Sequence, residues 1–181
     1  KTLQLFNSKF KYTRYTPMLY YKGDLSQPEE LAQKNMGKFM KILLIKRLES
    51  SFYAFKQSID RFIWSYEHFI QEFKDGNVYT SKKHSNKIFE FLENEDDAAI
   101  QKLIDDEKAE RHDSKGFKPE FEEDLNNDLE VLKEVKAMWD KVQRDPKLIA
   151  LEERLNTSER LKNNRLIIFT ESKETAEYLG A

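Results

Sequence analysis

Residues 31–73 decide the fold, and they read LAQKNMGKFMKILLIKRLESSFYAFKQSIDRFIWSYEHFIQEF. The large apolar residues in this stretch recur every three or four positions, which is the spacing of one face of an α-helix. No proline interrupts them, so the sequence predicts one long spine helix over about residues 29–74. At 1.5 Å per residue such a helix is roughly 60 Å long, longer than a compact domain of this size is wide. The rest of the chain should be arranged around it.

A second helical pattern covers residues 119–143, where apolar residues again follow a period of three to four. We expect this return helix to pack antiparallel to the distal part of the spine. Between the two, residues 86–111 predict two short acidic helices that close the tip, after a turn at Gly76 that ends the spine. Residues 1–144 therefore read as a helical arm.

The sequence pattern changes from residue 145 onward. Asp145 and Pro146 have the chemistry of a helix start, and residues 165–170, RLIIFT, contain four consecutive large apolar residues. Such a run is typical of a short strand that is buried on both faces of a parallel sheet. A helix should follow over residues 172–179, with Ala176 and Leu179 facing inward.

The predicted fold class is therefore mainly α: a long-helix antiparallel arm over residues 1–144, followed at 145–181 by a strand and helix that begin an α/β lobe without completing it. A buried-type strand without neighbours has unpaired edges. We therefore expect residues 165–170 to seek a partner, and self-association between copies is one outcome.

Composition narrows the class of protein. Charged residues make up 35% of the 181 and apolar ones 39%, and there are no cysteines, which excludes disulfides and thiolate metal sites and suits the cytoplasm. No apolar run reaches the length of a membrane span, so no membrane partner is expected. The three histidines do not have ligand spacing, so no metal site is expected either.

Charge is divided unevenly along the chain. Residues 1–89 carry 16 basic and 8 acidic side chains, whereas residues 90–130 carry 5 basic and 16 acidic ones. This division fits a basic nucleic-acid surface beside an acidic arm, and it fits equally two solvated faces that attract each other. Residues 1–22 interleave cations with aromatic rings, a pattern that suits single-stranded nucleic acid or a short helix packed on the spine through Leu3, Phe6 and Phe10.

The sequence gives only weak evidence for a catalytic or metal site. His112, Asp113 and Ser114 are the residue types of a hydrolytic triad, but adjacent positions do not converge on one proton relay. The acidic residues between 93 and 106 lack the loop spacing and glycine of an EF-hand, so they read as a solvated face.

Two stretches resemble one family. Residues 145–155, DPKLIALEERL, and 165–179, RLIIFTESKETAEYL, resemble the entry into the second RecA-like lobe of the Swi/Snf-type, superfamily-two helicase-like ATPases. Residues 36–55, MGKFMKILLIKRLESSFYAF, are similar to the helical region that bacterial members carry between their two lobes. The resemblance implies a parent enzyme that moves along or remodels duplex DNA with ATP and magnesium, and a chain that is part of it.

The chain departs from the family pattern in its catalytic motifs. It has no Gly-x-x-x-x-Gly-Lys-Thr phosphate loop, no Asp-Glu-x-His box and no arginine-bearing motif of the second lobe, and phosphoryl transfer needs such groups. The chain by itself is therefore not expected to hydrolyse ATP or to hold a cofactor. Its alternative function is that of a self-contained helical protein-interaction module.

The resemblance implies roles for two groups of residues. Thr170, Ser172 and Lys173 are similar in place to residues that contact the nucleic-acid backbone, although a plain strand-to-helix turn capped by Ser172 accounts for them equally well. The second group, in the middle of the spine, is expected to fix how the arm leaves the lobes, which is a structural coupling role; it consists of Lys46, Arg47 and Glu49.

Overall fold

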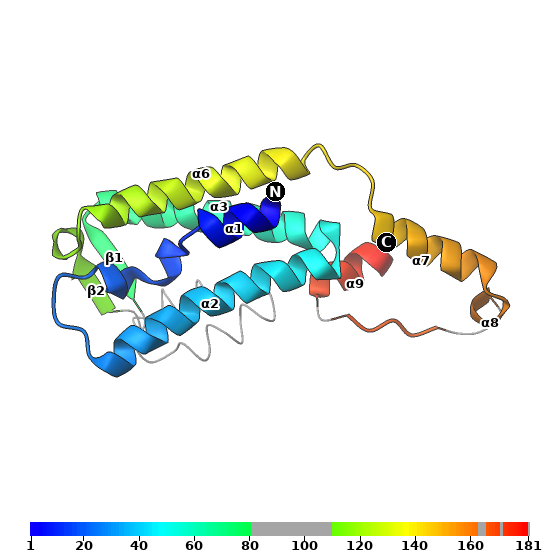
Figure 1. The fold of residues 1–181 in the computed structure, drawn as a ribbon, viewed down its shortest axis with the longest axis horizontal. Coiled ribbons are helices and arrows are strands. Elements are labelled where there is room, and N and C mark those ends of the chain that lie inside the picture. Colours follow the sequence, from blue (N-terminus) through cyan, green and yellow to red (C-terminus); the bar gives the residue numbers. More distant parts are fainter. Residues whose placement is uncertain (81–109, 163–165, 171, 181) are drawn as a thin grey trace.

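The computed structural model describes residues 1–80, 110–162, 166–170 and 172–180. The fold is mainly helical with one small antiparallel sheet, as the sequence predicts (Figure 1). None of the helices in the described ranges is long and apolar enough to cross a membrane. Most of the predicted acidic tip, residues 86–109, lies outside the described residues.

The predicted single spine is wrong, because the chain forms two helices there. Helix α2 (Gln27–Ser50) and helix α3 (Phe52–Lys74) meet at Ser51, whose backbone is extended with φ −154° and ψ 157°. The Ser51 hydroxyl accepts a hydrogen bond from the Ala54 N–H at 3.0 Å and so caps α3. From this corner both helices run back toward the same end of the molecule (Figure 1). The apolar period continues across the break because both helices bury their apolar faces in one core.

Helix α6 (Glu120–Trp139) is the return helix, and it packs antiparallel to α3 as expected. The direction follows from two ion pairs, Lys136–Asp60 at 2.7 Å and Lys133–Glu67 at 2.9 Å, because the higher number on α6 faces the lower one on α3. The core between the helices is rich in rings and leucines; its fully buried members include Phe6, Met40, Leu44, Phe55, Ile59, Tyr66, Phe121, Leu125 and Leu132.

A short hairpin closes the far end of the arm in the described residues. Gly76, with φ +90°, ends α3 in the left-handed conformation that glycine adopts readily. Strand β1 (Asn77–Thr80) then pairs antiparallel with β2 (Glu110–Asp113). The second acidic helix was predicted to run to residue 111, but residues 110 and 111 belong to β2, where pairing with β1 supplies their backbone hydrogen bonds.

The first 22 residues form a strap across the bundle, made of α1 (Thr2–Ser8) and the 3₁₀ turns η1 (Thr13–Tyr15) and η2 (Pro17–Tyr20). The rings of Phe6, Phe10 and Tyr12 are buried, whereas Leu3 is exposed. The expectation of a short helix packed on the core is thus confirmed, except for Leu3. Buried rings cannot stack on nucleotide bases, and the remaining rings, Tyr15, Tyr20 and Tyr21, are half-buried against the core, so packing accounts for this segment and the single-strand interpretation stays a prediction.

The C-terminal segment, residues 145–180, projects from the other end of the bundle and folds back on it (Figure 1). It contains α7 (Pro146–Thr157), α8 (Glu159–Lys162) and α9 (Lys173–Gly180). Residues 166–170 are extended but belong to no strand, and Ile167 and Phe169 are 80% and 90% exposed. The predicted buried strand is therefore absent here, because the described part of the chain has no neighbouring strand to pair with it.

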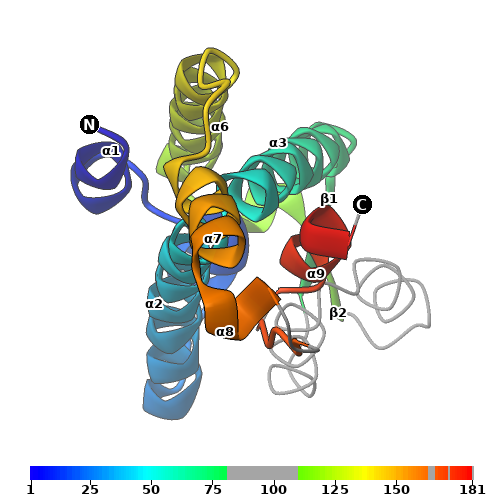
Figure 2. The ribbon, with the colours of Figure 1, turned by 90° about the vertical axis from the view of Figure 1, so that its right-hand side faces the viewer.

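Helix α9 forms as predicted, but a different face is buried. Ala176 is exposed and Leu179 is half-buried, while Glu174 and Thr175 are buried. Viewed from the end where α7 and α8 project, α9 lies beside α3 (Figure 2). A polar contact with the bundle thus replaces the apolar one that the sequence predicts.

Candidate functional site

The predicted functional residues gather at one place, which we call the junction. It consists of the corner between α2 and α3, the linker of residues 140–145, and α9. The junction lies at the opposite end of the arm from the β1–β2 hairpin (Figure 1). It is where the arm meets the C-terminal segment, so any movement of one against the other passes through it.

Four hydroxyl side chains join α9 to the corner, and we call them the hydroxyl ladder. Thr175 Oγ1 lies 2.9 Å from Ser50 Oγ and 2.9 Å from Ser51 Oγ. Ser50 Oγ is also 3.4 Å from Thr170 Oγ1. A hydroxyl both donates and accepts, so the ladder satisfies its own groups where Ser51 and Thr175 are buried.

Ser172 caps α9. Its Oγ accepts from the Thr175 N–H at 3.2 Å, and its own N–H donates to Thr170 Oγ1 at 3.2 Å. Ser172 is only 1% exposed. Of the three residues expected at the nucleic-acid backbone, Lys173 alone is exposed, with Thr170 half-buried. The turn is thus built as the plain alternative predicts, and Thr170 contacts the arm at Ser50.

An ion pair and a ring stack extend this contact. Arg61 on α3 pairs with Glu174, and its Nη2 donates to Ser58 Oγ at 3.1 Å. Tyr53 and Tyr178 stack with ring centroids 4.9 Å apart and ring planes within 5° of parallel. Burial raises the pKa of Tyr178, and the negative charges of Asp145 and Glu152 add to that rise.

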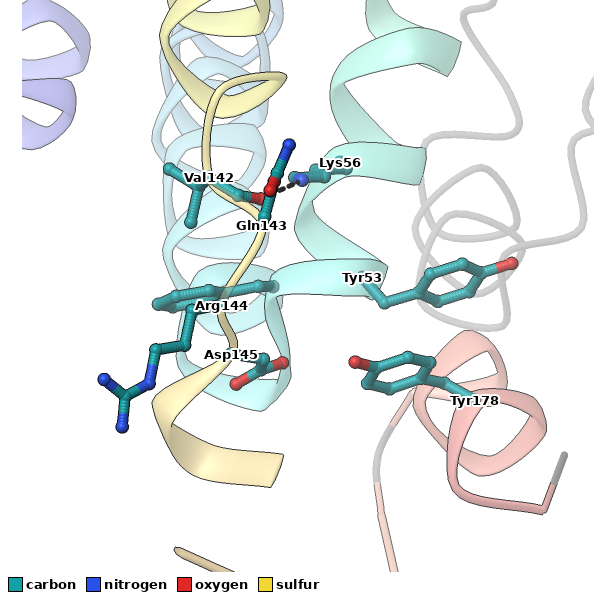
Figure 3. Close-up of a pocket in the computed structure, with 8 residues that line it drawn as sticks. Tyr53, Lys56, Val142, Gln143, Arg144, Asp145 and Tyr178 are labelled. Atoms are coloured by element: carbon teal, nitrogen blue, oxygen red, sulfur yellow. Dashed lines mark hydrogen bonds between the residues drawn. The ribbon is translucent and has the colours of Figure 1, made fainter. Parts of the chain in front are cut away.

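The linker and the first turn of α7 are tied to the two helices of the corner. Lys56 Nζ donates to the Val142 carbonyl at 2.7 Å (Figure 3), and Lys147 Nζ donates to the Glu49 carbonyl. Asp145 Oδ1 accepts from the backbone N–H groups of Lys147 and Leu148 at 3.0 and 3.3 Å, so the predicted cap of α7 is present.

A cavity of about 100 Å³ lies between the linker, α3 and α9. Figure 3 shows the Asp145 carboxylate and the Tyr178 hydroxyl facing each other across it. Ligand pockets usually measure about 300–1,000 Å³, so this cavity is too small for a nucleotide. The junction is built as a contact between two parts of the protein.

The residues expected to couple arm and lobes lie in the last two turns of α2, before the corner. Arg47 is buried, while Lys46 and Glu49 are exposed. Glu49 reaches the C-terminal segment through its backbone carbonyl, which accepts from Lys147 Nζ. Their coupling role stays a prediction. Sequence reasoning missed Arg61 and Glu174, because nothing local marks two charges 113 positions apart as partners.

A second polar centre lies inside the arm, where Asp128 on α6 is fully buried. Its carboxylate accepts from the Lys11 and Thr13 N–H groups at 2.6 and 2.7 Å and from the Tyr66 hydroxyl at 2.9 Å. Tyr12, between the two N–H groups, has φ +60°, a left-handed conformation that lets the N–H groups on either side converge on one anion.

This centre is structural because the protein's own carboxylate fills it. Burial raises the pKa of Asp128, and the hydrogen bonds from Lys11, Thr13 and Tyr66 oppose part of that rise. Neighbouring Asp124 accepts from Lys11 Nζ at 2.7 Å and from the Tyr20 hydroxyl at 2.8 Å. The two aspartates therefore hold the strap on α6.

The other candidate chemistry does not converge. His112 Nε2 lies 3.0 Å from Thr80 Oγ1, whereas Asp113 Oδ1 accepts from the Lys115 N–H at 2.9 Å, so the two form no relay. Among the described residues, no group of three histidine, aspartate or glutamate side chains is placed to hold a metal ion.

No protein-family model, curated protein or solved structure matches the chain. The resemblance to Swi/Snf-type ATPases therefore remains a prediction from the sequence.

Proposed function

We propose that this chain is a non-catalytic helical arm of a Swi/Snf-like DNA-dependent ATPase, and that it couples the two ATPase lobes to duplex DNA or to a partner. The observation that supports this is the junction. There the corner of the arm holds α9 through the hydroxyl ladder and the Arg61–Glu174 pair, at the point where the resemblance places the start of the second lobe.

In this proposal, the arm works by position rather than by chemistry. Its core gives a stiff lever, and the junction transmits a change in lobe orientation to the far end of the arm. ATP and magnesium belong to the parent enzyme, which acts in the cytoplasm. A phosphate loop and acidic box encoded upstream, with an arginine-bearing motif downstream, would support the proposal directly.

Duplex DNA binding tests the proposal on the chain itself. We expect weak binding by fluorescence anisotropy that is lost steeply as salt rises, because phosphate neutralisation is the only interaction available. Lys173→Ala should weaken binding and reduce the salt slope by about one. The control is Lys74→Ala, an exposed lysine at the far end of α3. Binding that is independent of salt, or equal losses in the two variants, would contradict the proposal.

The second candidate function is a self-contained helical interaction module. The observation in its favour is that the arm has its own continuous core, to which α7, α8 and residues 166–169 contribute no buried residue. Deleting the residues after Asn164 distinguishes the two. An unchanged melting temperature together with absent DNA binding would favour the module.

A further inference from the structure

We propose that Arg61 is a contact for a phosphate of the nucleic-acid backbone, and that the Glu174 carboxylate blocks it by occupying its guanidinium when α9 is docked. The docked α9 is then an autoinhibitory latch, and its release raises the affinity of the chain for duplex DNA. This inference rests on the proposed function, since that function supplies the ligand.

The first step is the chemistry of the Arg61–Glu174 pair. Guanidinium groups bind carboxylates and phosphates with the same planar fork of donors. Arg61 retains about a third of its side-chain exposure while it pairs with Glu174, whose side chain is mostly covered. A phosphate that approaches from solvent thus meets a cation whose anion partner belongs to a movable helix.

The second step is the composition of the docked face of α9. The buried residues there are polar, namely Ser172, Glu174 and Thr175, whereas Ala176 faces solvent. Polar contacts that are lost on undocking are replaced by contacts with water, so each contributes little net stability. A competing ligand can therefore displace α9 from the bundle.

The third step is what undocking uncovers. Thr170 is half-covered in the docked state and contacts the corner at Ser50, whereas the almost fully covered Ser172 turns its hydroxyl to Glu174 and the Thr175 N–H of its own helix. Lys173, already exposed, lies 3.8 Å from Glu177 on the outer side of α9. Opening would add the Arg61 guanidinium and the Thr170 hydroxyl to the Lys173 cation that the docked turn already exposes.

The fourth step is that opening disturbs no apolar core. Leu166, Ile167, Ile168 and Phe169, which precede the turn, are already exposed. Tyr53, the α3 ring that stacks on Tyr178, is itself 37% exposed. The latch can therefore open while the arm stays folded.

The test compares three variants of the whole chain for binding to a fluorescent 20-base-pair DNA duplex. Glu174→Gln removes the blocking charge and keeps the side-chain shape. We expect it to tighten binding by about five- to tenfold at low salt and to steepen the salt slope by about one, because one more phosphate is neutralised. Glu153→Gln, a control at an exposed acid on α7, removes an equal charge that belongs to neither the Arg61–Glu174 nor the Lys173–Glu177 pair and should change affinity less than about twofold.

Arg61→Ala separates a phosphate contact from a purely structural role. It breaks the same ion pair, so hydrogen exchange of α9 should accelerate as it does in Glu174→Gln, but affinity should not rise. Since the chain has no cysteines, a Ser51→Cys and Thr175→Cys pair gives a single disulfide lock. Oxidation of that pair in the Glu174→Gln background should cancel the gain, and reduction should restore it.

Each outcome decides the matter. Equal gains in Glu174→Gln and Glu153→Gln, or a gain in Arg61→Ala as large as that in Glu174→Gln, overturn the proposal that Arg61 is the blocked contact. If α9 exchanges faster in Glu174→Gln but this variant binds DNA no more tightly than a wild-type chain that does bind it, the latch is overturned and the proposed function is not. Absence of duplex binding by every form at low salt overturns the proposed function, and this inference with it.

Discussion

The two ends of the chain are attached to the same bundle by different chemistry. The strap at the N-terminal end buries Phe6, Phe10 and Tyr12 in the core and fixes its backbone to Asp128. The C-terminal segment instead leaves Leu166 to Phe169 exposed and is held by hydroxyls, the Arg61–Glu174 ion pair and a ring stack.

This difference teaches which end is part of the cooperative unit. Burial of rings is the dominant favourable term in folding, whereas exchange of polar contacts with water is nearly balanced. The strap should therefore unfold only with the whole arm, while the C-terminal segment should open locally. Four experiments test this comparison, starting with the largest effect.

The largest contrast is expected between two phenylalanines. Phe6→Ala in the strap removes a ring that is 1% exposed and should lower the free energy of unfolding by about 3–5 kcal/mol. Phe169→Ala removes a ring that is 90% exposed and should change it by less than about 0.5 kcal/mol. Chemical denaturation of both variants measures the contrast. A loss above 1 kcal/mol in Phe169→Ala would mean that residues 166–169 are covered in solution, for instance by a second copy.

The hydroxyl of Tyr66 tests the polar half of the strap's attachment. Its ring is fully buried, and the hydroxyl donates to Asp128 Oδ2 at 2.9 Å. Tyr66→Phe leaves the ring in place and should cost about 1–2 kcal/mol, since a buried carboxylate loses one donor. Tyr79→Phe, in the exposed edge of β1, is the control and should be neutral. A neutral Tyr66→Phe would show that the two backbone N–H groups suffice for Asp128.

The sequence predicts features set by neighbouring residues better than features set by contacts between distant parts of the chain. Helical period and caps are local, and they predict α6, the start of α7 and the stop at Gly76 correctly, although they join α2 and α3 into one helix. Sequence reasoning did not single out Asp128, because it is one of many acidic residues in this stretch. Its position could have indicated its role. Asp128 lies between Leu125 and Leu132 on the core face of α6, where an apolar residue is expected.

Two errors have physical causes of another kind. The break at Ser51 leaves the apolar period intact because α2 and α3 face one core, and only a serine pair before Phe52 marks a cap. The run of residues 166–169 has strand chemistry, but a strand needs a neighbour, and no strand in the described part of the chain pairs with these residues. Local sequence indicates that such a segment can form a strand. Tertiary context decides whether a partner strand is available to it.

A smaller effect is expected from pH at Asp128. Burial raises its pKa in the folded state above the ordinary value near 3.8, so folding favours its protonated form. The stability from this group is therefore fully present below the ordinary pKa and is lost as pH rises through the higher folded-state pKa. Relative to Asp128→Asn, which cannot titrate, the wild-type chain should lose stability over that interval.

The measurement is the free energy of unfolding of both proteins at several pH values from about 3 upward, through the range in which carboxyl groups titrate. Asp24→Asn, an exposed change in the connector before α2, corrects for the general loss of a carboxylate. If the wild-type chain instead gains stability with pH relative to Asp128→Asn, the three hydrogen bonds outweigh burial, and the strap is held by a charge.

The smallest global effect is expected at the hydroxyl ladder. Thr175→Val removes Oγ1, which contacts Ser50 and Ser51, and keeps the shape of the side chain. Because the C-terminal segment lies outside the cooperative unit, the free energy of unfolding of the arm should change by less than about 0.5 kcal/mol. Hydrogen exchange in α9 should nevertheless accelerate, because a local opening has become easier.

Thr157→Val is the matched control, since the Thr157 hydroxyl only donates to the Glu153 carbonyl within α7 and should leave α9 unchanged. If Thr175→Val destabilises the whole arm by more than 1 kcal/mol while α9 exchanges at the global unfolding rate, both ends of the chain belong to one unit. A latch could not then open without unfolding the arm, and the junction would be a rigid joint that transmits movement without yielding.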